Sequence, residues 1–536
     1  MSFDYVIVGS GAAGSVLANR LSADPGVSVL LLEGGGSDRS PIHKVPKGFV
    51  FTMTSPGFTR HYSTEPLDDS GASDSWFRGR VLGGSTTING LVWNRGWSPD
   101  YDQLELDGNK GWGWSTFLSA FRDIEDFRAD FPVDPGLRGR GGPAGVEVAR
   151  PQEQICEAFI DSGAAIGMRR VSDVNGSDTN RTGYAQYSTR RGLRVTAASA
   201  YLRPARRRPN LTVITNTEVD RVLFDGRHAI GVVVGSGASR REYKANKEVL
   251  LCAGALETPL LLERSGIGRG DVLDAAGIEL KVESPNVGER MSEHRGLRFM
   301  YRVKGAKGFN HLVNTQPRQL LTGAKFLATR SGIISQGSAS VLTYFTALDA
   351  AQRPDVIGFF SPMSVKSATI HDKRMATSDE PGMMVGVYPL RPTSRGSIHV
   401  RDATPGSAPK VVANFLSTDY DKSVIVAMAA KVREHFASGA ISGHVDAPLA
   451  PACTLDDPEE LLRHALTGGA SGYHTLGTCA MGPNADDVVD GELRVRGTEA
   501  LRVVDASVFP HQPSGNTSAP TQALAWHAAS LILGEA

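Results

Sequence analysis

The chain has few cysteines for its length. Its 536 residues include Cys156, Cys252, Cys453 and Cys479, too few for a disulfide framework, and none of them forms a Cys-x-x-Cys pair. The sequence also lacks cysteines and histidines clustered at metal-ligand spacing, so we expect no metal site. This pattern is typical of a protein from a reducing compartment.

Charge excess and long apolar runs are absent too. Lys plus Arg and Asp plus Glu both number 57, so the net charge is zero, whereas a dedicated nucleic-acid binder carries a basic excess. The longest apolar run, at 249–256, falls far short of the ~20 residues that a membrane span requires. No basic segment followed by an apolar one opens the chain. We therefore expect a cytoplasmic protein with neither nucleic-acid nor membrane partners.

Apolar residues and glycines, in contrast, are plentiful. Hydrophobic residues make up 40% of the chain, enough for a sizeable core, and the length predicts several domains at ~100–200 residues each. The 60 glycines indicate tight turns and close approach of the backbone to a ligand. Strand-like runs between residues 340 and 420 predict a separate, mostly antiparallel sheet. Residues 60–110, rich in Gly, Ser, Asp and Trp, are expected to be irregular.

A dinucleotide-binding motif opens the chain. An apolar run predicts a buried parallel strand, followed by the turn 9–14 (Gly-Ser-Gly-Ala-Ala-Gly), a helical pattern and a second strand ending in Glu33. Gly9 permits the tight turn, Gly11 lets the backbone approach a pyrophosphate, and Gly14 lets the helix pack on the strand. Glu33 lies at the spacing of a carboxylate that binds ribose hydroxyls. By itself the motif predicts a dinucleotide, either NAD or FAD.

Four further segments complete a set of five ordered motifs. They are a second glycine-rich loop at 79–89, an element at 254–268, the segment Tyr-His-Thr-Leu-Gly-Thr-Cys-Ala-Met-Gly at 473–482, and a last element at 504–521. Together the five motifs resemble the glucose–methanol–choline (GMC) oxidoreductases over nearly the whole chain. The resemblance implies FAD rather than NAD, held in a Rossmann-like domain, and a second domain whose six-stranded antiparallel sheet roofs the flavin.

The resemblance implies an α/β (α+β overall) fold of two domains. The FAD-binding domain takes residues 1–150, 195–300 and 465–536, and the substrate-binding domain takes residues 151–194 and 301–464. The residues matched to FAD binding are Gly9, Gly11, Ala12, Ala13, Gly14, Glu33, Arg80, Gly83, Gly84, Asn89, Val219, Asp505 and Ala506. Some members tether FAD through a histidine immediately before the loop asparagine. Ile88 stands there in this chain, so we expect noncovalent FAD.

His474 matches the family's catalytic histidine. Moving a hydride from an alcohol carbon to flavin N5 leaves charge on the oxygen unless the hydroxyl proton also leaves, and a neutral imidazole is a suitable acceptor. The family's second residue, His or Asn, usually lies some forty positions further on, where this chain has Ser518. Ser518 can hydrogen-bond the substrate but cannot act as a second base, so His474 would carry the proton alone. Asn516 is the alternative second residue.

The predicted reaction is oxidation of a primary alcohol to the aldehyde, with electrons passed to O₂ or another acceptor. An aryl or heteroaryl methanol suits one base and a small neighbour, and Phe359, Phe360, Tyr388 or Trp93 could stack on its ring. His294 matches a family segment that ends in Asp-His, and we expect a structural role near the flavin face. Two alternatives stay open: a hydroxynitrile-lyase-type reaction with redox-silent FAD, favoured by the missing second residue, and a non-catalytic flavin-binding protein.

Overall fold

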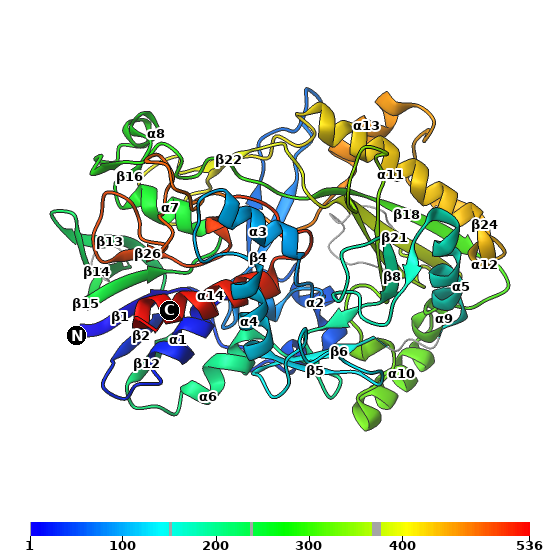
Figure 1. Cartoon of the computed structure of the whole chain (residues 1–536), viewed down its shortest axis with the longest axis horizontal. Coiled ribbons are helices and arrows are strands. Elements are labelled where there is room, and N and C mark those ends of the chain that lie inside the picture. Colours follow the sequence, from blue (N-terminus) through cyan, green and yellow to red (C-terminus); the bar gives the residue numbers. More distant parts are fainter. Residues whose placement is uncertain (1, 150–152, 236–239, 367–376, 536) are drawn as a thin grey trace.

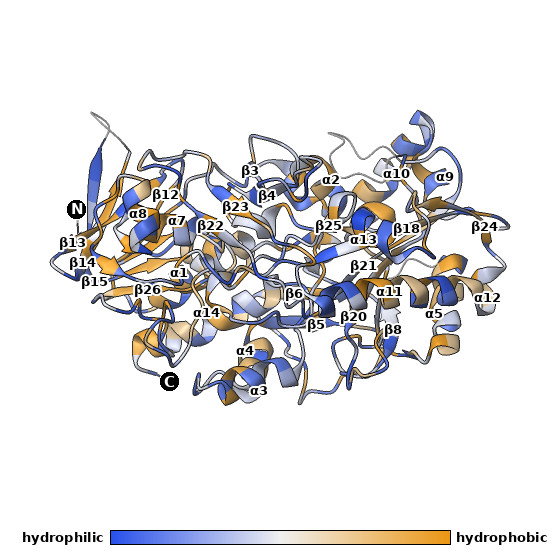
Figure 2. Ribbon diagram, turned by 90° about the horizontal axis from the view of Figure 1, so that it is seen from above, coloured by the Kyte–Doolittle hydropathy of each residue, from blue (hydrophilic) through white to orange (hydrophobic). Residues whose placement is uncertain are grey.

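The computed structural model describes residues 2–149, 153–235, 240–366 and 377–535, with two large β-sheets toward opposite ends of the long axis (Figure 1). Hydrophobic residues gather in the strands of these sheets and in the helix faces packed on them (Figure 2). Each sheet contributes to its own cluster of buried apolar side chains. Within these ranges, no helix is both long enough and apolar enough to cross a bilayer.

The first sheet is built around the N-terminal strand. Its spatial order is β12 (Leu211–Ile214), β2 (Val29–Leu32), β1 (Ser2–Val8), β15 (Arg241–Leu251), β14 (His228–Val234) and β13 (Val219–Asp225), and β26 (Leu501–Val503) pairs with residues 249–251 of β15. Helix α1 (Gly14–Leu21) connects β1 to the parallel β2, which confirms the predicted strand–helix–strand unit. The first half of β15 is a largely exposed arm that pairs with β14, and its last residues are buried.

Helices near the two ends of the chain pack together. Helix α14 (Ser518–Leu533) packs against α1, and both lie close to β1 and β2 (Figure 1). The first sheet therefore draws on three stretches that are far apart in sequence, near residues 2–32, 211–251 and 501–503. Such interleaving brings residues from both ends of the chain to one site.

The second sheet has eight strands where we expected six. Its order is β24 (Val445–Ala450), β18 (Arg295–Val303), β21 (Gly382–Pro389), β20 (Val356–Ser361), β19 (Val341–Phe345), β8 (Arg181–Tyr184) and β7 (Arg169–Arg170), with β25 (Ala470–Ser471) beside β18. All pairs are antiparallel except β7–β8. Two of the eight strands, β7 and β25, have only two residues each, too few to produce a period-two pattern. One face packs on helix α11 (Asp419–Ala437), and the other carries Arg298 and Met384 into a cavity.

The expectation of an irregular region at 60–110 was wrong in part. An antiparallel hairpin, β3 (Thr59–Ser63) and β4 (Ser75–Gly79), begins it, and helix α3 (Ser98–Leu106) ends it. The strands are short and rich in polar residues, and the helix carries no clear apolar stripe, so neither shows a strong period. Residues 80–97 between them contain one short 3-10 helix (Gly84–Thr87), turns and isolated bridges.

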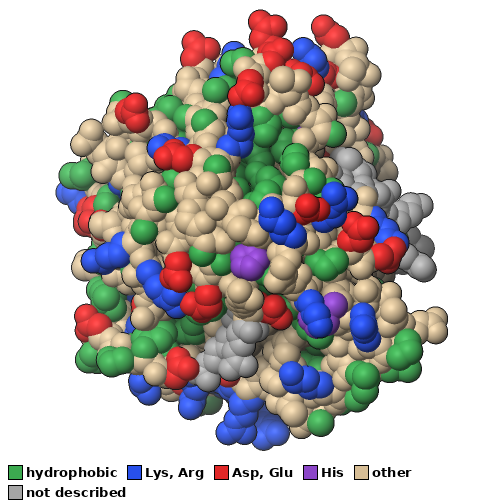
Figure 3. Space-filling view, turned by 90° about the vertical axis from the view of Figure 1, so that its right-hand side faces the viewer, with side chains coloured by type: hydrophobic (Ala, Val, Ile, Leu, Met, Phe, Trp, Pro, Cys, Tyr) green, Lys and Arg blue, Asp and Glu red, His purple; other side chains and the backbone are tan. Residues whose placement is uncertain are grey.

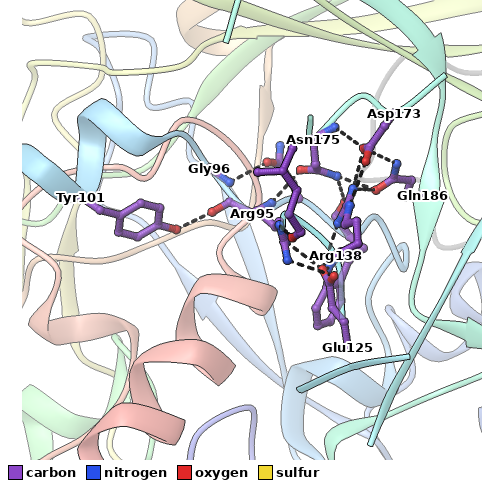
Figure 4. Close-up of polar contacts among 11 residues, drawn as sticks. Arg95, Gly96, Tyr101, Glu125, Arg138, Asp173, Asn175 and Gln186 are labelled. Atoms are coloured by element: carbon purple, nitrogen blue, oxygen red, sulfur yellow. Dashed lines mark hydrogen bonds and ion pairs between the residues drawn. The ribbon is translucent and has the colours of Figure 1, made fainter. Parts of the chain in front are cut away.

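A buried ion network anchors the end of that loop (Figure 4). Glu125, fully buried, accepts from Arg95 Nε at 2.8 Å and from Arg138 Nη1 at 2.9 Å. Arg138 also binds Asp173; burial of this carboxylate opposes ionisation, but the charge and hydrogen bonds of Arg138 outweigh it and lower the pKa of Asp173 to about 2. The network thus ties the loop that follows Asn89 to the segment leading into the second sheet.

The surface at the end that carries the second sheet is mixed in character. Basic and acidic side chains both occur across this face, with hydrophobic ones among them (Figure 3). On helix α10 (Gln316–Thr329), Leu320, Leu321 and Leu327 are at least 70% exposed. No single sign of charge covers the visible face, in keeping with the balanced composition.

Candidate active site

A cavity of about 530 Å³ runs from the carboxyl end of β1 to a pair of buried histidines. Most residues that the sequence matches to the cofactor line this cavity, namely Gly9, Gly11, Ala12, Ala13, Glu33, Arg80, Gly84, Asn89, Val219, Asp505 and Ala506. Gly14 and Gly83 lie behind the wall. A Cβ at Gly14 would lie 1.9 Å from the Gly9 carbonyl oxygen, and one at Gly83 would lie 2.4 Å from Thr87 Oγ1. These two glycines shape the backbone and do not face the cavity.

Two glycine segments form a cradle without side chains. Gly9 has a φ of +99°, which other residues rarely adopt, and a Cβ there would lie 2.4 Å from the Cys252 carbonyl oxygen. A Cβ at Gly11 would meet nothing within 4 Å, because this backbone faces open space. Gly84 lies close against Gly11, because a Cβ at Gly84 would lie 2.9 Å from Gly11 Cα. A pyrophosphate requires such bare backbone beside a helix N-terminus, so the cradle fits the cofactor.

Glu33 closes this end of the cavity from the tip of β2. Its carboxylate accepts hydrogen bonds from the Ser10 N–H at 3.0 Å, the Ser10 hydroxyl at 2.6 Å and the Gly35 N–H at 2.7 Å. Burial raises the pKa of Glu33, and these three hydrogen bonds oppose that shift. A carboxylate offers about four acceptor positions, so one is left toward the cavity for a ribose hydroxyl.

Asp505 and Asn89 are held by other parts of the chain. Asp505 Oδ2 accepts from the Gly254 N–H at 2.8 Å and from Thr258 Oγ1 at 2.6 Å, which joins the turn after β26 to the one after β15. Asn89 Oδ1 accepts from Arg194 Nη1 at 3.0 Å. Each side chain is fixed before any ligand arrives.

Arg80 and Val219 line the edge of the same region. Arg80 is 46% exposed at its side chain and forms an ion pair with Glu218 at 2.9 Å. Glu218 also binds Arg60 at 2.6 Å and directly precedes Val219, the first residue of β13. The ion pairs hold the second glycine-rich loop against the strand that carries Val219.

At the opposite end of the cavity, His474 is hydrogen-bonded at both ring nitrogens. Its Nδ1 lies 3.0 Å from Nδ1 of His294, and its Nε2 lies 2.9 Å from Nδ2 of Asn516. Nε2 of His294 lies 3.0 Å from the Leu390 carbonyl oxygen. Burial lowers the pKa of His294 to about 4. It also lowers the pKa of His474 well below the usual value, and His294 and Arg78 add to that shift.

Glu293 holds the backbone of both histidines. Its Oε1 accepts from the N–H of His474 at 2.7 Å and from the N–H of His294 at 2.9 Å, and its Oε2 accepts from Thr475 Oγ1 at 2.6 Å. Arg78 lies 3.4 Å from the same Oε2. Glu293 was not among the predicted site residues. The signal that could have found it is its place directly before His294, where the matched family segment has an aspartate.

Asn516, and not Ser518, forms the described hydrogen bond to His474. Ser518 is the first residue of α14, and its hydroxyl lies 3.4 Å from Nε2 of Gln522, one turn further along the helix. It lines the same cavity as His474, and its described hydrogen bonds go to Gln522 and not to the histidine. The chain reaches Asn516 through Gly515, whose φ of +151° and close approach to Asn94 exclude a side chain.

The wall of the cavity is partly aromatic and partly cationic. Besides the residues named above, its lining includes Phe77, Arg78, Arg298, Met363, Val365, Met384 and Tyr473. The aromatic residues named from the sequence as ring-stacking candidates lie outside this wall. Phe360 stacks on Phe159 in the core, Trp93 donates to Glu125, and Tyr388 packs between His294 and Phe359. Tyr388 lies on the same face of the second sheet as Met384, Phe360 lies on the opposite face, and Trp93 lies outside any strand, so the period of the sequence could not assign them to the cavity.

Comparison with known proteins agrees with this geometry. Sequence profiles of the GMC oxidoreductases match residues 3–295 and 392–525. The chain is 34% identical over 540 residues to the oxygen-dependent choline dehydrogenase of Photobacterium profundum, covering 99% of this chain and 93% of that one. It is 31% identical over 535 residues to an alcohol dehydrogenase (acceptor) of Pseudomonas putida, covering 99% and 96%.

Solved structures give the same answer. Pyridoxine 4-oxidase from Mesorbium loti superposes with a TM-score of 0.88 at 29% identity, covering 99% of each chain. A variant of formate oxidase from Aspergillus oryzae superposes with a TM-score of 0.92 at 26% identity, covering 100% of this chain and 98% of that one. The profile matches span most of the sequence, and the relatives span nearly all of it. The chain is therefore a member of the GMC oxidoreductase family and an FAD-dependent oxidoreductase.

Proposed function

We propose that this chain oxidises a primary alcohol to the aldehyde, with His474 as the base that takes the hydroxyl proton. The observation that carries the proposal is the contact between His474 Nε2 and Asn516, at the end of the cavity that also contains the glycine cradle. His474 is buried and neutral, as a proton acceptor must be. The Asn516 amide is placed to donate to the substrate oxygen as its proton leaves. Bound FAD supplies the two-electron acceptor for the hydride, and O₂ or another oxidant takes the electrons onward.

The proposed cofactor is noncovalent FAD, held by the cavity residues named above. Ile88 occupies the tethering position and is 3% exposed. Among the described residues that line the cavity, His474 is the one histidine, and its ring is already engaged at both nitrogens.

We propose the same two domains as the sequence suggests. In support, the strands of the first sheet all fall within 1–150, 195–300 and 465–536, and those of the second sheet fall mostly within 151–194 and 301–464. β18 crosses the proposed boundary at residue 300, and β25 lies in the last FAD segment. The histidine pair sits where the two parts meet.

The substrate we propose is an aryl or heteroaryl methanol that is neutral or negatively charged. Arg298 lies on the cavity face of β18, and burial lowers its pKa. The acidic residues in the described lining are each bonded elsewhere: Glu33, Glu218, Glu257 and Asp505. A quaternary ammonium alcohol such as choline would therefore meet the Arg298 guanidinium in this cavity, while the four carboxylates of the described lining are already engaged. Phe77 and Tyr473 offer ring surface instead.

The argument for the lyase alternative no longer applies. That alternative was favoured by a missing second residue beside the catalytic histidine, and Asn516 now occupies that place. A non-catalytic protein would have no need of a buried, doubly hydrogen-bonded histidine in its cavity. We therefore propose neither.

Anaerobic mixing with alcohols tests the proposal. Benzyl alcohol, hydroxymethyl-pyridines and hydroxymethyl-furans should bleach the bound flavin of the wild-type protein, and choline and aliphatic alcohols should do so poorly. His474→Ala should retain FAD but bleach ~10²–10⁴-fold more slowly, the usual contribution of general-base catalysis. Admitting air then distinguishes rapid from slow reoxidation, hence an oxidase from a dehydrogenase. Full bleaching by choline alone would contradict the substrate class, and unchanged bleaching in His474→Ala would contradict the base.

A further inference from the structure

His294 bears directly on the protonation of His474. The two Nδ1 atoms lie 3.0 Å apart, within hydrogen-bonding distance. A hydrogen bond between two neutral imidazoles at these atoms contains one proton, which belongs to one ring or to the other. The ring that holds it decides which nitrogen of His474 carries a lone pair toward the substrate. The sequence predicted only a structural role for His294.

The Leu390 carbonyl decides between the two arrangements. It can only accept, and Nε2 of His294 lies 3.0 Å from its oxygen, so Nε2 carries a proton. His294 is neutral because burial lowers its pKa to about 4, so its Nδ1 must have a lone pair. That nitrogen then accepts from the Nδ1–H of His474. The reverse arrangement would set a lone pair against a carbonyl oxygen at a site with no solvent exposure to relieve it.

The surroundings keep both rings in this arrangement. Tyr388 stacks on His294 with ring centroids 4.3 Å apart and planes 25° from parallel. The Gly472 N–H donates to the His294 carbonyl at 2.9 Å, and a Cβ at Gly472 would lie 2.7 Å from Nδ1 of His474. The backbone therefore passes directly over the bond between the two imidazoles. Glu293 holds both residues through their N–H groups.

We propose that His294 is a positioning residue that sets the tautomer of His474. In this tautomer Nδ1 of His474 is protonated, and Nε2 presents its lone pair to Asn516 and the cavity. The donors point one way along the chain: Asn516 to His474, His474 to His294, and His294 to Leu390. When His474 takes the hydroxyl proton at Nε2, the lone pair of His294 faces the resulting imidazolium and stabilises it.

The kinetic part of this inference rests on the proposed function, but the tautomer is a property of the resting protein. The charged and titratable groups that face the two rings are Arg78, Glu293, Tyr388 and Asp421. None of them offers Nδ1 of His474 an alternative acceptor within hydrogen-bonding distance among the described contacts. His294 is thus the one described group that can hold that proton in place.

Nitrogen NMR of the resting holoenzyme tests the tautomer without any variant. In protein labelled with ¹⁵N-histidine, ring nitrogens with and without a proton resonate in separate regions, and the spectra of His474→Ala and His294→Asn assign the two rings. At pH 7 we expect His474 to show a protonated Nδ1 and an unprotonated Nε2, and His294 to show the reverse. A protonated Nε2 on His474 would overturn the proposal.

Two substitutions of His294 isolate its acceptor. Both His294→Asn and His294→Leu lose the bond to Leu390, but the asparagine oxygen can still accept from Nδ1 of His474. We expect His294→Leu to slow flavin reduction by about 10–100-fold, the usual effect of losing a partner that orients an active-site histidine. His294→Asn should retain most of the rate. FAD content and the unfolding temperature control for folding.

The outcomes separate this inference from the proposed function. If His294→Leu binds FAD and reduces as fast as the wild type, the positioning role is wrong even though alcohol oxidation stands. If no alcohol reduces the wild-type flavin, the proposed function fails, and the nitrogen spectrum still decides the tautomer. If His294→Leu does not bind FAD, the wild-type spectrum and His294→Asn decide.

Discussion

Asn516 Nδ2 lies 2.9 Å from Nε2 of His474, whereas the hydroxyl of Ser518, two residues further, faces Gln522. Replacing Asn516 by alanine removes the donor placed to meet the substrate oxygen. Because a hydrogen bond to a developing charge contributes ~1.5–3 kcal/mol, we expect Asn516→Ala to slow anaerobic flavin reduction by about 10–100-fold. Ser518→Ala should slow it by less than about threefold. A larger loss in Ser518→Ala would show that Ser518 is the second active-site residue, as its spacing from His474 predicts.

The rate of flavin reduction should depend on pH only in acid. Burial, with His294 and Arg78, lowers the pKa of His474 well below the usual 6.5. A base with a lowered pKa is neutral above that pKa, so the rate should be flat from pH 6.5 upward and fall only at lower pH. Stopped-flow measurement of reduction between pH 5 and 9 checks this expectation. An inflection at or above pH 6.5 would show that His474 is not the titrating base.

Arg298 should govern discrimination by substrate charge. We expect the wild-type protein to oxidise 4-(hydroxymethyl)benzoate with a higher kcat/KM than an analogue with a trimethylammonium group in place of the carboxylate. Arg298→Met should lower kcat/KM for the carboxylate about tenfold, the effect of losing ~1.4 kcal/mol of charge interaction, and change benzyl alcohol little. Arg128→Met, at an arginine that is 67% exposed at its side chain, is the matched control. Unchanged selectivity in Arg298→Met would remove Arg298 from the substrate site.

Glu125 should be essential for stability. Glu125→Ala leaves Arg95 and Arg138 buried without their shared partner, and breaking such a buried pair costs ~3–5 kcal/mol. Asp456→Ala removes the partner of Arg433 at an exposed site and should cost about 1 kcal/mol or less. Thermal unfolding of both holoenzymes measures the difference. Equal unfolding temperatures would mean that water enters the network and solvates the two arginines.

The flavin should leave the protein on denaturation. Acid precipitation breaks noncovalent contacts but not a covalent tether, so FAD should appear in the supernatant with the pellet colourless. Ile88→His places a histidine at the position that tethers FAD in some relatives, and it tests whether the site can support a bond. Yellow colour retained in the wild-type pellet would contradict noncovalent binding.

The sequence predicted the parts of the fold that depend on local pattern. Continuous apolar runs, the turn at 9–14 and a helical pattern located β1, α1 and β2, because strand burial and the absence of a Cβ at Gly14 are properties of neighbouring residues. Strands of two residues, such as β7 and β25, leave no period to read. The hairpin of β3 and β4 went unpredicted since its polar residues resemble those of a loop.

Only some residues of the active site could be predicted from the sequence. His474 could be named from its flanking motif, but its partners His294 and Asn516 come from positions far apart in sequence. Spacing alone favoured Ser518, because counting residues does not reveal that a helix already begins there. Glu293 shows the same limit: its function lies in two backbone bonds that only the folded chain brings together.

The placement of β26 has a consequence for how the protein is made. During synthesis, residues 249–251 of β15 emerge without their β26 neighbour. That neighbour, residues 501–503, appears only after the whole segment between them has been translated. Asp505, which ties the turn after β26 to Gly254, arrives with it. Until then the open edge is a target for pairing with other nascent chains. Cofactor capture is therefore a late event, and a premature stop codon shortly before residue 501 would leave a chain with its glycine-rich turn intact and no flavin.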